Sequence, residues 1–119
     1  MTGATTMARE RVRDALDALA LIELRLKGVS AEKLAADDVL IDACCYRVVI
    51  VGEAVGYAKT HRPDVFAGTP VAGTTWDALV LIRNHFVHSY AQVTARMLVA
   101  YLAGLPSVRL GLANVVGKL

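Results

Sequence analysis

The chain has 119 residues, a length typical of one domain, and we expect a single domain over residues 1–119. Apolar residues make up 55% of it and aromatic residues only 6%, which favours helices packed together over a β-sandwich. The net charge of +2 is too small to indicate a nucleic-acid-binding protein by charge alone, so any RNA contact has to be local.

The first predicted helix spans about residues 8–27, where apolar side chains recur at steps of three and four residues. Gly28 is a typical residue to end it. Residues 29–37 form a connection with one helical turn.

The second predicted helix begins at a cap formed by Asp37 or Asp38 and runs to about Thr60. It is apolar nearly all round, which predicts the most buried element of the fold. It nevertheless contains charged side chains, whereas a membrane span has few or none, so we expect a buried helix and no membrane. These charged residues include Asp42, Arg47 and Glu53.

Four polar residues of this helix share one narrow stripe. Asp42, Tyr46, Glu53 and Tyr57 lie at offsets of 0, 4, 11 and 15, which align at helical spacing. The stripe is either an edge that faces solvent or a polar strip that faces a groove.

Residues 63–74 contain two Pro and two Gly and predict a loop. A third helix then begins at Trp76, capped by Thr74 or Thr75, and ends near His88 or Ser89.

A fourth helix, capped by Thr94, spans about residues 95–103, and Gly104 and Pro106 end it. The tail, residues 107–119, adds a short amphipathic turn. Four main helices with short connections predict an all-α antiparallel bundle, and the high apolar content predicts a second subunit that covers part of it.

Cys44 and Cys45 are adjacent, and neighbouring cysteines rarely form a disulfide with each other. We expect buried free thiols, which favour a reducing compartment and a cytoplasmic protein.

Residues 83–90 concentrate the chemistry of the chain, because they contain a guanidinium, an amide, two imidazoles, a hydroxyl and a phenol. Arg83 is always charged and can bind a phosphate with two N–H groups, and His88 can move protons at neutral pH. Cleavage of RNA by its own 2′-hydroxyl needs these two functions and no metal.

Each of these residues also has an ordinary explanation when taken alone. Arg83 can be a surface residue in an ion pair, and His85 can be an ordinary histidine on a helix surface. His88 can interact with the dipole at a helix C-terminus, and Tyr90 can be a packing residue. Arg83 and His88 are five residues apart, about 140° around an ideal helix, so a two-fold dimer would help to assemble one site. His85 and His88 lack a third metal ligand at a recognisable spacing, so we expect no metal site and no cofactor.

The spacing Arg83-x-x-x-x-His88-x-Tyr90, with Asn84 after the arginine, resembles the signature of the HEPN superfamily, and within it the HepT branch of HepT–MntA toxin–antitoxin pairs. Upstream, residues 50–54 (Ile-Val-Gly-Glu-Ala) resemble the family's "iGEA" stretch, and Trp76 resembles the Trp that opens the motif helix. The resemblance covers about residues 38–110.

The resemblance implies a homodimeric bundle of four to five helices and a metal-independent endoribonuclease that leaves 2′,3′-cyclic phosphate and 5′-hydroxyl ends. It implies that Arg83 stabilises the scissile phosphate, that His88 is the acid or base, and that Asn84 orients His88 or the phosphate. Tyr90 is then the residue to which an MntA-like nucleotidyltransferase antitoxin transfers AMP. Glu53, on the polar stripe, is expected to face Arg83.

The chain departs from the family after the tyrosine, because residues 91–94 (Ala-Gln-Val-Thr) lack the usual acidic residues. Two alternatives to the ribonuclease toxin remain at this point. One is a HEPN-type binding module that partners a nucleotidyltransferase without cutting RNA, and the other is a structural helical dimer without a site.

Overall fold

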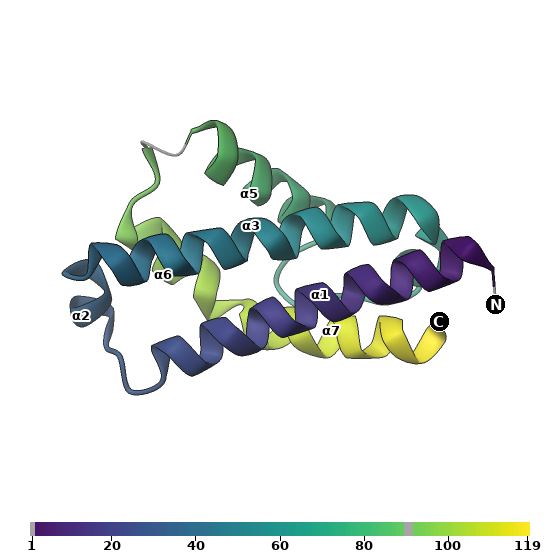
Figure 1. Ribbon diagram of the computed structural model, residues 1–119, viewed down its shortest axis with the longest axis horizontal. Coiled ribbons are helices and arrows are strands. Elements are labelled where there is room, and N and C mark those ends of the chain that lie inside the picture. Colours follow the sequence, from purple (N-terminus) through teal and green to yellow (C-terminus); the bar gives the residue numbers. More distant parts are fainter. Residues whose placement is uncertain (1, 90–91) are drawn as a thin grey trace.

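Two long antiparallel helices organise the fold of the computed structural model, which describes residues 2–89 and 92–119 (Figure 1). α1 (Gly3–Leu26) and α3 (Asp38–His61) lie side by side along the 46 Å long axis of the molecule. Small and branched apolar residues at helical spacing face the partner helix, so the two helices approach closely along their length. The buried residues include Ala8, Val12, Ala15, Leu19 and Ile22 of α1 and Cys44, Val48, Val51, Val55 and Ala58 of α3.

The helix that carries the candidate site is α5 (Trp76–His88), which packs on α3. The Asp37 side chain accepts the Leu40 N–H at the start of α3, and the Thr75 hydroxyl accepts the Ala78 N–H at the start of α5. Thr94 caps α6 (Ala95–Ala103) in the same way. All three caps were expected, because a short polar side chain before an apolar run satisfies a free N–H of the first turn.

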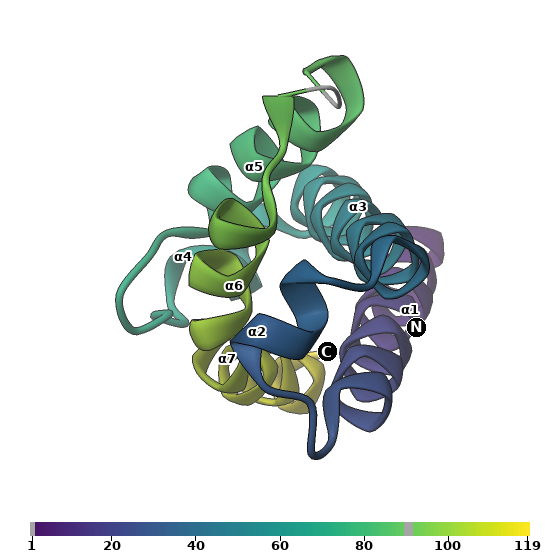
Figure 2. The same ribbon diagram turned by 90° about the vertical axis from the view of Figure 1, so that its left-hand side faces the viewer.

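The expectation for the C-terminal tail is wrong, because residues after Gly104 form a full helix, α7 (Leu105–Lys118). Pro106 lies in its first turn, where no hydrogen bond from the backbone nitrogen is needed, so proline begins this helix and does not exclude it. Viewed from its end, the bundle has α7 below α1 and α3, and the short helix α2 (Ala31–Ala35) crosses the near end (Figure 2).

The expected loop over residues 63–74 also begins as a helix, α4 (Pro63–Ala67), again with proline in the first turn. Phe66 of α4 packs edge-on against Trp76, with 5.2 Å between ring centroids. The Trp76 indole N–H donates to the Thr69 carbonyl at 2.7 Å, which satisfies the one polar group of a buried ring. The start of α5 is therefore anchored in the core.

Within the described residues, no helix by itself has the length and apolar character needed to cross a membrane. The consecutive helices α6 and α7, bent by 47° at their junction, reach that length and composition only when they are counted together.

Cys44 and Cys45 are buried free thiols, as expected. Burial raises the pKa of the Cys45 thiol from its usual 9.0 to about 11, with smaller contributions from Cys44 and Asp42. Burial also raises the pKa of the Cys44 thiol, an effect that the nearby Arg25 opposes. Both side chains are therefore held as neutral thiols in the core.

We expect these thiols to weaken the fold at high pH. Because the pKa is higher in the folded than in the unfolded chain, the unfolded chain loses the protons first, and the free energy of unfolding falls as pH rises from 9 toward 11. Urea unfolding measured below pH 9 and near pH 11 checks this. The Cys44→Ala/Cys45→Ala variant should lose less stability over that interval, and an identical loss in both proteins would contradict the assignment.

Candidate functional site

The candidate site is built where α5 crosses α3 at Gly52. A Cβ atom on Gly52 would overlap the Arg83 Cβ and lie 2.8 Å from the Leu79 carbonyl oxygen. Only glycine fits at this contact, so the absence of a side chain at residue 52 determines how closely the two helices approach. Near the C-terminus of α3, the Lys59 ammonium pairs with Asp77 in the first turn of α5.

Arg83 is held at this crossing by two polar neighbours. Its Nη1 donates to the Asn84 side-chain oxygen at 2.9 Å, and its Nη2 lies 3.9 Å from the Glu53 carboxylate. The expectation that Glu53 faces Arg83 is confirmed. The Arg83 side chain is 29% exposed, so its guanidinium is oriented by the protein yet open to a ligand. An ion pair this open contributes little stability, and its value lies in orienting the cation.

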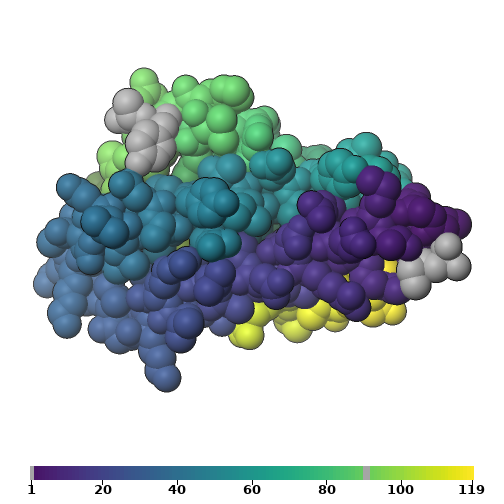
Figure 3. All heavy atoms as spheres, in the orientation of Figure 1, coloured from purple at the N-terminus to yellow at the C-terminus, as the bar shows by residue number. Residues whose placement is uncertain are grey.

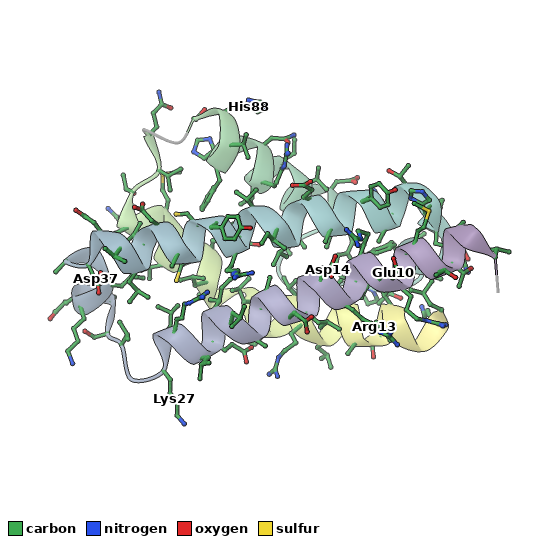
Figure 4. The ribbon with its side chains drawn as sticks, viewed as in Figure 1. Glu10, Arg13, Asp14, Lys27, Asp37 and His88 are labelled. Atoms are coloured by element: carbon green, nitrogen blue, oxygen red, sulfur yellow. The ribbon has the colours of Figure 1, made fainter. Side chains whose placement is uncertain are left out.

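His88 is the last residue of α5 and is exposed, and Figure 4 shows it at the tip of that helix, away from α1. Since α5 is helical through residues 76–88, Arg83 and His88 keep the expected divergence of about 140°. Arg83 turns toward α3, and His88 projects from the free end. The predicted site residue Tyr90 lies outside the described residues.

His85 differs from the expectation of a simple surface histidine. Its ring is half-buried, and its Nε2 is buried with no hydrogen-bond partner among the described residues. It lines an apolar cleft of about 450 Å³ between α5 and α6, together with Phe86 and Tyr101. No local pattern in α5 indicates this burial, because it depends on where α6 lies.

All four residues of the α3 stripe (Asp42, Tyr46, Glu53 and Tyr57) are exposed, so the stripe faces solvent. It also borders a groove of about 390 Å³ between α1 and α3, lined by Glu53, Tyr57 and the α1 residues Arg11 and Asp14. Asp14 lies on the side of α1 that faces α3 (Figure 4). Figure 3 shows this face, with α5 rising above α3. The two interpretations of the stripe are therefore compatible.

A family model for ribonuclease HepT-like proteins matches residues 15–104, which is most of the chain. The chain belongs to the HepT-like ribonuclease family. The match covers α5 and the Gly52 crossing, and the helical bundle agrees with the HEPN fold. Searches of curated proteins and of solved structures found no significant match.

Membership of the HepT-like family supports ribonuclease activity and agrees with RNA as the class of substrate. In the part of this HepT-like chain that the structure describes, no three His, Cys, Asp or Glu side chains are grouped to hold a metal ion. The polar groups that the α3–α5 crossing brings together are Arg83, Asn84 and Glu53.

The crossing makes a direct prediction for Gly52→Ala. The added methyl group has to push α5 away from α3, and overpacking of this kind costs about 1–3 kcal/mol, more than the gain of up to about 1 kcal/mol in helix propensity. Urea unfolding should therefore show a lower free energy of unfolding for Gly52→Ala than for the wild type.

The matched control is Gly117→Ala in α7, where an added Cβ meets no atom within 4 Å. This variant should be as stable as the wild type or slightly more so. Equal stability of the two variants would show that the α3–α5 contact is looser than described.

Proposed function

We propose that this HepT-like protein is a metal-independent endoribonuclease toxin of a toxin–antitoxin pair that cleaves RNA, with tRNA as a candidate substrate. The main support for this proposal is that one helix presents two suitable groups: the Arg83 guanidinium, which is oriented by the protein and partly exposed to solvent, and the exposed imidazole of His88. The family match supports the nuclease class. Residues 83 and 88 supply the cation and the proton carrier that the reaction requires.

In the proposed reaction, a base removes the proton of the RNA 2′-hydroxyl, and the 2′-oxygen forms a bond to phosphorus. The bond from phosphorus to the 5′-oxygen breaks, and an acid protonates that oxygen, which leaves a 2′,3′-cyclic phosphate and a 5′-hydroxyl. Arg83 stabilises the negative charge that builds up on the phosphate oxygens. His88 acts as the base or the acid.

The reaction uses two proton-transfer groups, and each chain has one His88. A two-fold homodimer would place two copies of α5 opposite each other and provide both groups in one groove. Exposed apolar side chains on α5 and α6 support this arrangement, since Leu81 is 66% exposed and Val87 and Met97 are also exposed.

The proposal includes control by a partner nucleotidyltransferase of the MntA type that transfers AMP to the Tyr90 hydroxyl. Tyr90 is two residues beyond His88 in the sequence. A bulky, negatively charged adenylate at that position would repel RNA and obstruct access to His88.

His88→Ala should reduce cleavage of total tRNA in EDTA by about 100-fold or more, the effect of losing a general acid or base. The protein should unfold at an unchanged temperature, because His88 is exposed at a helix end. Gly117→Ala should cleave as the wild type does. The wild type must first be shown by intact mass to carry no AMP. Absence of cleavage by that unmodified protein would favour the alternative, a non-catalytic HEPN module that binds a nucleotidyltransferase.

Tyr90→Phe should abolish modification by the cognate nucleotidyltransferase, because it removes the acceptor oxygen and keeps the ring. The measurement is the intact mass after co-expression, or transfer of labelled AMP in vitro. Tyr46→Phe and Tyr57→Phe remove the hydroxyls of two exposed tyrosines and should still be modified. Label that persists on Tyr90→Phe would rule out Tyr90 as the acceptor.

A further inference from the structure

Two tyrosines on α3 stand out because their rings are exposed on a helix whose other face forms the core. Tyr46 is 61% exposed and Tyr57 is 43% exposed. They are eleven residues apart, which places them within about 20° on the same helix face and roughly 16 Å apart along the axis. The structure thus presents two aromatic rings in line along one surface.

Each ring is supported on one side by a neighbouring group. The Arg47 guanidinium carbon lies 5.1 Å from the centre of the Tyr46 ring. The His61 ring lies 4.4 Å from the Tyr57 ring at an interplanar angle of 32°, and its Nδ1 is 2.9 Å from the Tyr57 carbonyl oxygen. Such support restricts the orientation of the rings while much of each remains open to solvent.

The Arg83 guanidinium lies between the two rings along the helix, because it contacts Glu53, seven residues after Tyr46 and four before Tyr57. The groove beside Tyr57 contains a second cation, Arg11. The acidic groups there already have cationic neighbours, since Asp14 lies 3.0 Å from Arg11 and Glu53 lies 3.9 Å from Arg83. The surface therefore combines aromatic rings with cations whose charge is partly balanced.

We propose that this face of α3 binds single-stranded RNA, with unpaired bases stacked on Tyr46 and Tyr57 and one of the phosphates between them at Arg83. Every base has a flat face, so stacking on tyrosine tolerates any sequence and requires bases that are not paired in a duplex. At about 3.4 Å per stacked nucleotide, the distance between the rings accommodates at most about five nucleotides. The role of Arg83 rests on the function proposed above, whereas the stacking sites do not.

The test measures RNA binding separately from cleavage, in a His88→Ala background that leaves the RNA intact. Fluorescence anisotropy with a labelled single-stranded oligoribonucleotide gives the Kd of this protein and of versions that also carry Tyr46→Ala or Tyr57→Ala. Loss of one stacked base should raise the Kd by about tenfold. Tyr46→Phe and Tyr57→Phe retain the ring and should restore binding.

Two further controls complete the design. Leu110→Ala removes an apolar side chain of α7 that is 67% exposed, more than either tyrosine, and should leave the Kd unchanged. A duplex of the same sequence should lose little affinity with either Tyr→Ala variant, because its bases are already stacked. Sedimentation analysis of every variant reports whether the oligomeric state is preserved.

The proposal is overturned if the Tyr→Ala variants bind single-stranded RNA as tightly as their parent, or if the Tyr→Phe variants are weakened to the same extent. It is also overturned if the Tyr→Ala variants lose affinity only because they change oligomeric state, which would assign this face to a second copy of the chain. If the wild type cleaves RNA but the Tyr→Ala variants bind it as tightly as their parent, only the stacking inference is overturned. If those variants bind RNA more weakly but the wild type does not cleave it, only the proposed activity is overturned.

Discussion

The contact between the backbones of α3 and α5 at Gly52 is the constraint on which the rest of the site depends. With no side chain at residue 52, α5 lies close enough for the Arg83 guanidinium to reach the carboxylate of Glu53, the next residue of α3. A single methyl group there would separate the helices and move Arg83 together with the helix that carries His88. The position of the proposed chemistry is therefore determined by the packing of two helices and not by a loop.

The two ends of α5 differ in how firmly the core holds them, and this difference suits the proposed reaction. Trp76 is buried at the N-terminal end, hydrogen-bonded to Thr69 and packed on Phe66, whereas His88 is exposed at the other end. A cation that must meet a phosphate at a fixed place benefits from the rigid part of the helix. A group that exchanges protons with substrate needs access, which the exposed end provides.

Much of this arrangement follows from the sequence because its determinants are local. Side-chain caps at Asp37, Thr75 and Thr94 fix helix starts, and the helical spacing of the polar residues on α3 places Glu53 on an exposed stripe. The errors arise where one residue type serves opposite purposes. Gly104 and Pro106 follow the end of α6 as predicted, but Pro106 also lies in the first turn of α7, where only a short turn was expected. The burial of His85 depends on where α6 lies, which no local pattern specifies.

The charge distribution limits how this family member can hold RNA. The net charge is only +2, and the cations Arg11 and Arg83 beside the groove each lie next to a carboxylate, on Asp14 and Glu53. A binding surface that relied on phosphate contacts alone would need several unopposed cations and would weaken steeply with salt. Stacking on aromatic rings supplies affinity without net charge. In the proposed binding mode, the exposed tyrosines of α3 supply the affinity that the electrostatics of this chain lack, and they lie on either side, along the helix, of the arginine that the proposed reaction requires.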